Sequence, residues 1–208
     1  MFDTDLKGKK VIVRVDFNVP LDSDLHVSDD TRIRAAVPTI QALLSKGAKV
    51  ILMSHLGRPL KDLDEAGNIK AKYSLRSIVN KVSENIGREV VFISTPLTES
   101  NINDDIDQVD DHKVILLENT RFYKGEEKGD RELAQKMASL AEYYVNDAFG
   151  TAHREHASTA TIARFFDQDH KTFGLLMDKE VTNIAKVLHD INRPFCAIIG
   201  GAKVSDKI

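Results

Sequence analysis

The chain has 208 residues with a formal net charge of −3 at pH 7, and 42% of its residues are hydrophobic and 29% are charged. This composition is typical of a globular protein with a real core and excludes a disordered chain. The slightly acidic balance argues against a general nucleic-acid-binding protein, which carries a basic surplus. Any anion site must therefore come from local clusters of arginine and lysine.

The only cysteine, Cys196, excludes an intrachain disulfide and fits a reducing compartment. The first residues lack the apolar region that follows the basic start of a signal peptide. No apolar run approaches the ~20 residues that a membrane helix needs. We therefore expect a cytoplasmic protein with no membrane or nucleic-acid partner.

The first predicted strand, residues 11–17, is a run of β-branched residues of the kind that is buried on both faces of a sheet. It ends in the polar residues Asp16 and Asn18, and Pro20 stops it. In parallel α/β sheets ligands bind at the carboxyl ends of the strands. The strand thus indicates both an architecture and a place for chemistry.

Strands and helices alternate along the rest of the chain. Further strands are predicted at 49–53, 90–93, 114–117, 143–146 and 195–199. Helices are predicted at 31–45 with Gly47 after it, from Ser74 to Gly87, at 130–141, 157–166 and 177–191. Repeated βα units without hairpin signals predict a parallel sheet with helices on both sides. The acidic segment 101–111 is most simply a solvated loop or short helix.

The sequence predicts a change of domain near the end of the chain. Residues 1–174 form the first domain, and an amphipathic interdomain helix spans 175–193. Residues 194–208 supply one strand and a glycine turn, the beginning of a second domain. A segment this short cannot bury enough surface to offset its ordering. The sequence therefore resembles a truncated piece of a longer two-domain protein.

Basic side chains follow several of the strands. Arg32 and Arg34 open the first helix, His55 and Arg58 follow the second strand, and further arginines stand at 121 and 154. Because parallel strands share one carboxyl edge, these side chains can converge there. Arginine forks make paired hydrogen bonds to phosphate or carboxylate. The spacing predicts a cleft for a small polyanion.

Simpler interpretations exist for each residue alone. A single arginine near a strand end is usually a surface ion-pair partner, and Arg14 is interpreted as a structural partner for a nearby acid. His55 is either a satisfied core histidine or an anion contact. Asp16 and Asn18 can serve as caps of the strand end. His153 shapes its loop, and Cys196 is inert in an apolar strand.

No pattern for other chemistries is present. The sequence lacks a Walker A loop, a Gly-x-Gly-x-x-Gly turn and a Gly-x-Ser-x-Gly elbow. The histidines lack the spacing of zinc ligands, so no metal site is predicted.

Taken together, five segments resemble the phosphoglycerate kinase family, in order along the whole chain: RVDFNVP at 14–20, SHLGRP at 54–59, ENTRF at 118–122, NDAFGTAHR at 146–154 and GGAKVSDK at 200–207. The resemblance implies a three-layer α/β/α fold with a six-stranded parallel sheet. It also implies reversible phosphoryl transfer between 1,3-bisphosphoglycerate and ADP, giving 3-phosphoglycerate and ATP in glycolysis. MgATP or MgADP would be a co-substrate, and the enzyme a monomer.

The resemblance also implies roles for particular residues. The phosphoglycerate contacts would be Asp16, Phe17, Asn18, Arg32, His55, Leu56, Gly57, Arg58, Arg121 and Arg154. Arg32, rather than Arg34, would lie nearest the transferred phosphoryl group. Lys203 and Lys207 would contact nucleotide phosphates, with Lys207 and Arg32 as the catalytic residues. A carboxylate acceptor with a pKa of about 3–4 is already ionised at pH 7, so no general base is needed.

The family pattern continues beyond Ile208, so we expect this piece to hold phosphoglycerate weakly, bind no cofactor tightly and be inactive alone. Its partner would be the missing C-terminal nucleotide domain. Two alternatives stay open. One is a non-catalytic small-anion-binding module. The other is an interaction fragment whose 177–191 helix exposes apolar surface.

Overall fold

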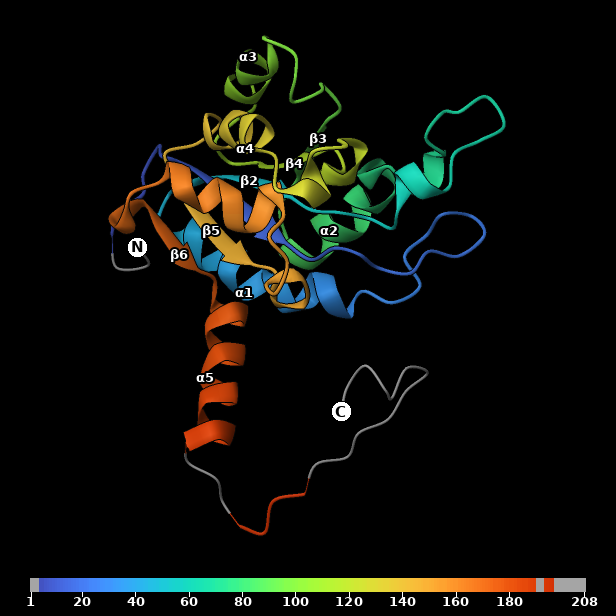
Figure 1. The fold of residues 1–208 in the computed structure, drawn as a ribbon. Helices are drawn as coiled ribbons and strands as arrows, with labels where there is room; N and C mark the ends of the chain where they lie inside the picture. The colour runs from blue at the N-terminus through green and yellow to red at the C-terminus, as the bar shows by residue number, and fades with distance from the viewer. Residues whose placement is uncertain (1–3, 190–192, 197–208) are drawn as a thin grey trace.

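The computed structural model describes residues 4–189 and 193–196, and its centre is one parallel sheet (Figure 1). The strand order is β3-β4-β2-β1-β5-β6, and every neighbouring pair is parallel. The strands are β1 Lys10–Val15, β2 Lys49–Met53, β3 Val90–Ile93, β4 Val114–Leu117, β5 Tyr143–Asp147 and β6 Lys171–Phe173. The predicted α/β fold with a six-stranded parallel sheet is confirmed.

Helices cover both faces of the sheet, which makes three layers (Figure 1). On one face lie α1 (Thr31–Ser45) and α2 (Val79–Ile86), and on the other lie α3 (Ile102–Asp107), α4 (Arg131–Ala138) and the turns at 157–165. Val11 and Val13 pack toward α1, whereas Ile12 packs toward the opposite layer, and all three are fully buried. Each such burial stabilises the fold by about 1.5–3 kcal/mol.

The predicted strands at 49–53, 90–93 and 114–117 are confirmed to the residue. The first strand ends at Val15, two residues earlier than expected, and β5 runs one residue further, to Asp147. The earlier end of β1 leaves Asp16 and Asn18 in the loop beyond the sheet. Strand β6 was not predicted, because three residues with a lysine and a threonine carry too little periodicity.

The helix predictions differ from the structure mainly at helix ends. Ser74 caps a 3-10 turn that leads into α2, and Gly87 ends α2 with φ +72°. Helix α4 ends at Ala138, three residues short of the prediction. The segment at 157–166 is not an α-helix but a π-turn followed by a 3-10 turn. Segment 101–111 contains the short helix α3.

Helix α5 (Leu175–His189) begins two residues before the predicted 177–191 helix, at the first residue of the interdomain segment expected at 175–193. Asp147 Oδ1 accepts the backbone N–H groups of Leu176 and Met177, at 3.0 and 3.1 Å. Thr39 Oγ1 accepts the N–H of Leu175 at 2.9 Å. These side chains satisfy amide groups that a helix start leaves without partners, and they come from β5 and α1, far away in sequence.

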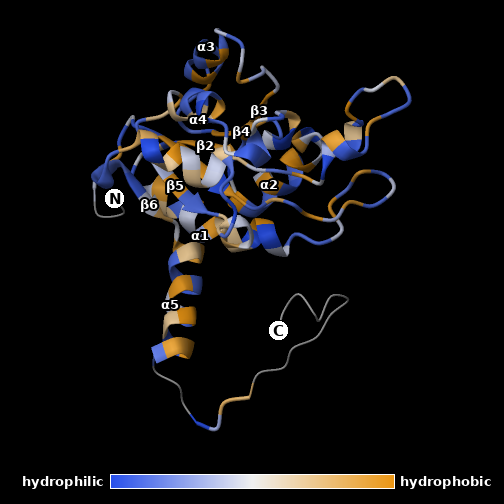
Figure 2. Cartoon of the chain, viewed as in Figure 1, coloured by the Kyte–Doolittle hydropathy of each residue, from blue (hydrophilic) through white to orange (hydrophobic). Residues whose placement is uncertain are grey.

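Beyond its first turn α5 projects away from the sheet (Figure 1). Figure 2 shows hydrophobic positions along this projecting part, and Val181, Ile184 and Leu188 are 43%, 46% and 65% exposed. Phe195 and Cys196 lie in no regular structure and are exposed, so the expectation that Cys196 is inert inside an apolar strand is wrong in its placement. The rest of the predicted 195–199 strand, the glycine turn, Lys203 and Lys207 lie outside the described residues.

Candidate anion-binding site

A cavity of about 230 Å³ lies at the carboxyl edge of the sheet. Its walls come from the loops after β1, β2 and β5, from the 3-10 turn after β4, and from the start of α1. The structure thus brings together side chains from five separate stretches of the chain. The lining residues are Asp16, Asn18, Arg32, His55, Gly57, Arg58, Arg121, Gly150, Thr151 and Arg154.

Two of the sequence-predicted contacts, Phe17 and Leu56, do not line this cavity. Both are buried in the hydrophobic core on the α1 side of the sheet. The backbone N–H of Phe17 donates to Ser54 Oγ at 2.8 Å, which ties the end of β1 to the end of β2. Their side chains therefore support the walls from behind.

Asp16 and Arg32 form an ion pair at the rim of the cavity. Arg32 Nη1 donates to Asp16 Oδ2 at 2.7 Å, and half of the Arg32 side chain is exposed. Gly150 packs close by, since a β-carbon there would stand 2.8 Å from Asp16 Oδ2. Arg34 lies outside the cavity and pairs with Asp30 at 2.9 Å.

Asn18 braces the loop after β2. Its Oδ1 accepts the backbone N–H of Gly57 at 2.8 Å. The carbonyl of Gly57 in turn accepts from Arg121 Nη1, also at 2.8 Å. The loop that carries Arg58 is therefore held from β1 on one side and from the turn after β4 on the other. Asn18 therefore both lines the cavity and holds the loop after β2 that forms part of its wall.

Arg121 is the buried arginine of the site, with 6% of its surface exposed. Its Nε has no hydrogen-bond partner and lies 3.6 Å from Glu127 Oε1. Burial lowers the pKa of Arg121, because a charged guanidinium loses hydration there. Asn119, fully buried, positions it by accepting the Arg121 backbone N–H at 3.0 Å.

Arg58 and Arg154 add positive charge without a matching acid. No carboxylate of the described part of the chain lies within 4.0 Å of either guanidinium. Arg154 Nε donates instead to His153 Nε2 at 3.3 Å, which agrees with a loop-shaping role for His153. Cations that converge on a cavity repel one another unless an anion binds between them.

His55 is neutral at the back of this cavity. It is 3% exposed, and burial together with Arg14, Arg121 and other nearby cations lowers its pKa to about 2. Arg14, fully buried, donates from Nε to Ser158 Oγ at 2.8 Å, and its Nη2 lies 3.2 Å from His55 Nδ1. The acid expected beside Arg14 is present only indirectly, because Ser158 Oγ donates to the buried Glu126.

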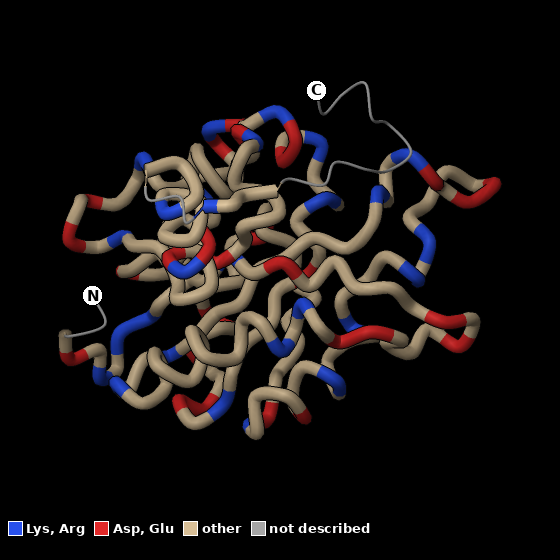
Figure 3. Tube along the Cα trace, turned by 90° about the horizontal axis from the view of Figure 1, so that it is seen from below, with Lys and Arg blue, Asp and Glu red and all other residues tan. Residues whose placement is uncertain are grey.

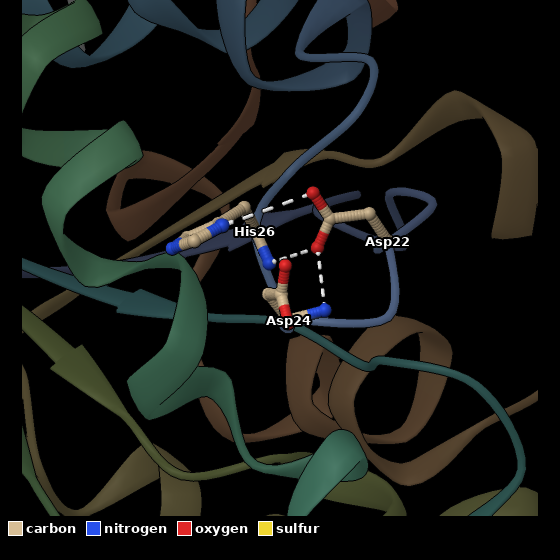
Figure 4. A group of neighbouring side chains, drawn as sticks. All are labelled: Asp22, Asp24 and His26. Carbon is tan, nitrogen blue, oxygen red and sulfur yellow. Dashed lines mark hydrogen bonds and ion pairs between the residues drawn. The ribbon is translucent and has the colours of Figure 1, made fainter.

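Two other features of the surface do not form a comparable site. Asp22, Asp24 and His26 lie together, but all three are exposed and Asp22 Oδ1 accepts the backbone N–H groups of the other two (Figure 4). This carboxylate organises its own loop. A larger cavity of about 420 Å³ beside β5 and β6 is lined by no arginine. The ammonium group of Lys171, which lines it, donates hydrogen bonds to the backbone carbonyls of Ala163 and Phe166.

The charges are mixed over the rest of the molecule. Figure 3 shows lysine and arginine interspersed with aspartate and glutamate along the trace, rather than one continuous basic surface. In the described part of the chain no helix combines the length and apolar character required to span a bilayer. The fold and the cavity together define an α/β protein with an arginine-lined cavity at the carboxyl edge of a parallel sheet.

Comparison with known proteins assigns the family. The family model described as phosphoglycerate kinase matches residues 1–208. Phosphoglycerate kinase from Porphyromonas gingivalis is 47% identical over 224 residues, covering 97% of this chain and 52% of the relative. The cytosolic phosphoglycerate kinase of Triticum aestivum is 49% identical over 210 residues, covering 99% of this chain and 49% of the relative. The chain belongs to the phosphoglycerate kinase family.

Solved structures agree with this assignment. Phosphoglycerate kinase from Coxiella burnetii superposes with a TM-score of 0.82 at 36% identity, covering 100% of this chain and 49% of that structure. The enzyme from Pyrococcus horikoshii also gives 0.82, at 29% identity and 98% and 49% coverage. The chain spans about half the length of the curated relatives and solved structures that it matches.

Sequence reasoning missed the residues that hold the site in shape. Asn119, Thr151 and Gly150 stand inside quoted motifs and are detectable there as polar or small residues within four positions of an arginine. Ser158 and Glu126 are different, because nothing local distinguishes a serine or a glutamate that meets a buried arginine. Only the packing of the 157–161 turn against β1 and the turn at 126–128 reveals them.

Proposed function

We propose that this chain forms the phosphoglycerate-binding half of the active site of a phosphoglycerate kinase. The reaction is reversible phosphoryl transfer between 1,3-bisphosphoglycerate and ADP, giving 3-phosphoglycerate and ATP in glycolysis. The observation that carries the proposal is the convergence of Arg32, Arg58, Arg121 and Arg154 with His55 on one cavity of about 230 Å³. A molecule with one phosphate and one carboxylate matches this set of donors.

The chemistry requires charge neutralisation more than proton transfer. In the ATP-consuming direction the acceptor is a carboxylate, which is already ionised at neutral pH. Catalysis then consists of orienting this carboxylate and stabilising the charge on the transferred group. Arg32 is suited to the second task, because it lies at the open rim and is kept in place by Asp16.

The other half of the reaction belongs to a nucleotide domain. We propose that Lys203 and Lys207 contact the phosphates of the MgATP or MgADP co-substrate, with Lys207 assisting Arg32 in catalysis. We also propose domain limits of 1–174, 175–193 and 194–208, and a cytoplasmic location, which the names of two cytosolic relatives support. The chain of residues 1–208 alone would bind no nucleotide tightly and show no turnover.

Calorimetric titration of residues 1–208 with 3-phosphoglycerate tests this proposal. Replacing one arginine that binds the ligand should weaken binding roughly 10- to 150-fold, since a charge-assisted hydrogen bond contributes about 1.5–3 kcal/mol. The variants are Arg58→Ala and Arg154→Ala, and Arg34→Ala is the matched control outside the cavity. If Arg58→Ala and Arg154→Ala bind 3-phosphoglycerate as tightly as the Arg34→Ala control, the assignment of the cavity as the phosphoglycerate site is refuted.

A non-catalytic small-anion-binding module is the second candidate, because the cavity alone does not require a nucleotide. It predicts that inorganic phosphate competes as well as 3-phosphoglycerate does. The kinase proposal predicts a strong preference for the molecule that carries both anionic groups. A coupled ATP assay on the same chain checks the expected inactivity, and more than trace turnover contradicts it.

A further inference from the structure

The ring of His55 lies between two groups that make opposite demands on one nitrogen. Arg14 Nη2 is 3.2 Å from His55 Nδ1, and Asp16 Oδ1 is 3.9 Å from the same atom. A guanidinium has only donors, so it needs a lone pair on Nδ1, whereas a carboxylate needs a hydrogen there. Only the Arg14 distance lies near hydrogen-bonding range.

Arg14 has no freedom to turn away from His55. Its Nε donates to Ser158 Oγ at 2.8 Å, and Nη1 donates to the carbonyl of Val15. Ser158 is itself oriented, because both its hydroxyl and its backbone N–H donate to the buried Glu126. The hydroxyl hydrogen therefore points at Glu126 and an oxygen lone pair faces Arg14.

We propose that Arg14 is a positioning residue that holds His55 as the neutral tautomer with its hydrogen on Nε2. His55 lines the cavity, and with Nδ1 facing Arg14 the other ring nitrogen, Nε2, is the one left to donate a hydrogen bond to an anionic oxygen there. The identity of that anion rests on the function proposed above, whereas the tautomer does not. The chain Glu126–Ser158–Arg14–His55 thus couples the buried turn at 126–128 to the anion site.

The charges around His55 favour a donor that is not itself a cation. Arg14, Arg32, Arg121 and Arg154 all act on the ring from β1, α1 and the loops after β4 and β5, and Asp16 is the acid that faces it. Another positive charge would raise the repulsion in the empty cavity. A neutral Nε2–H instead donates to the ligand throughout the physiological pH range. The lowered pKa of His55 agrees with this arrangement.

NMR of the ligand-free chain tests the tautomer directly. Long-range proton–nitrogen spectra of ¹⁵N-histidine-labelled protein, with His55→Gln for assignment, should show pyridine-type Nδ1 and pyrrole-type Nε2 signals. These signals should not change between about pH 8 and 5, whereas an unperturbed histidine side chain changes its charge within this range, near 6.5. The opposite tautomer, or an imidazolium pattern at the lower pH, would overturn the proposal.

Variants test whether Arg14 and its support cause the effect. In Arg14→Met the His55 signals should show a titration or a shift toward the Nδ1–H form, because Asp16 is then the nearest partner of Nδ1. Ser158→Ala keeps Arg14 but removes the hydroxyl that accepts from its Nε, and should change the His55 signals in the same direction by a smaller amount. This second variant provides the test if Arg14→Met does not fold. His55 signals identical to wild type in the folded variants would refute a positioning role.

Addition of 3-phosphoglycerate separates this inference from the proposed function. The Nε2–H signal of His55 should shift while the tautomer stays the same, and Ser158→Ala should weaken binding several-fold. Binding without a shift at Nε2 would overturn the donor role and leave the proposed function intact. Absence of binding with the expected tautomer would refute the proposed function and the donor role, and leave the effect of Arg14 on His55 standing.

Discussion

Gly57 lies directly against the ring of Tyr73. A β-carbon at Gly57 would stand 2.5 Å from Tyr73 Cε1, and the backbone there has a left-handed φ of +61°. The ring is held in place because the Tyr73 hydroxyl donates to Asp62 Oδ2 at 2.6 Å. The other side of Gly57 is bonded to Asn18 and Arg121. The loop that presents Arg58 is therefore fixed from both sides.

Gly57→Ala should destabilise the fold and weaken anion binding together. The left-handed backbone alone costs about 1–2 kcal/mol with a β-carbon, and displacement of the Tyr73 ring adds to this. Gly67→Ala is the matched control, since Gly67 also has a positive φ, +82°, but a β-carbon there would meet nothing within 4 Å. Urea unfolding and titration with 3-phosphoglycerate measure both effects. Equal destabilisation and unchanged affinity in the two variants would contradict the close packing described for Gly57.

Asn119→Ala should be among the most destabilising polar substitutions in the described chain. The Asn119 amide donates to the carbonyls of Leu56 and Tyr73, both at 2.8 Å, and its oxygen accepts from Arg121. Loss of these buried bonds should lower the free energy of unfolding by about 2–4 kcal/mol, because buried carbonyls are left without partners. Asn101→Ala, at an exposed position, should change it by less than about 0.5 kcal/mol. A small effect at Asn119 would show that water replaces the lost amide.

Asp147→Ala should weaken the attachment of α5 to the sheet. The substitution leaves the N–H groups of Leu176 and Met177 without their acceptor and should cost about 1–2 kcal/mol, as for loss of a helix cap. Asp178→Ala is the control, because Asp178 is an exposed acid in the same first turn. Hydrogen exchange at residues 175–177 should accelerate in the first variant and not in the second. Unchanged exchange in Asp147→Ala would show that the carboxylate does not hold the helix.

The stability of the chain should depend on His55 below neutral pH. The pKa of His55 is about 2 in the folded protein and 6.5 ordinarily. Between these two pH values His55 is therefore protonated in the unfolded chain and neutral in the folded chain. The stabilisation is fully present above pH 6.5 and is lost as pH falls toward 2. Relative to His55→Gln, the wild type should lose up to about 1.4 kcal/mol per pH unit in this window. Parallel stability curves for the two proteins between pH 7 and 5 would contradict the neutral buried ring.

Arg32→Ala should affect turnover more than binding. We expect this in an active enzyme that combines this chain with the C-terminal half of a family member. The half-exposed Arg32 is already paired with Asp16, so it contributes little to ground-state binding. Loss of charge stabilisation at the transferred group should lower kcat about 100-fold or more, with a few-fold change in KM. Arg34→Ala should leave both constants unchanged. A large rise in KM at constant kcat would make Arg32 a simple binding residue.

Much of the fold was predictable because interior strands carry their own signal. The runs that became β2, β3 and β4 are apolar throughout apart from Lys49. β2 and β4 are central strands with both faces covered, and β3 carries the same apolar signal although it forms one edge of the sheet. β6 lacks this signal, and becomes a strand because its backbone pairs with β5 at the edge of the sheet. The 157–166 segment is the reverse case, because its sequence predicts an α-helix and the structure has a π-turn followed by a 3-10 turn.

The candidate site likewise has features that the sequence predicts and features that it does not. The positions of Arg32, Arg58, Arg121 and Arg154 follow from the sequence, because each stands just beyond a strand or at the helix that follows one. Their individual environments do not. Arg32 is paired and half-exposed, Arg121 is buried, and no described carboxylate lies within 4.0 Å of the Arg58 or Arg154 guanidinium. Burial and pairing depend on which loops meet, and local sequence does not encode that.

The architecture and the arginine-rich character of the candidate site are predictable from the sequence, because apolar periodicity and the residues that follow each strand are local properties. The partners and the burial of those residues are set by contacts between distant parts of the chain. The partner of Arg14 is Ser158, 144 positions away, and Tyr73 closes on Gly57 across a long loop. The tautomer of His55, the charge of the cavity and the start of α5 all depend on such long-range contacts, which form only when the sheet has assembled.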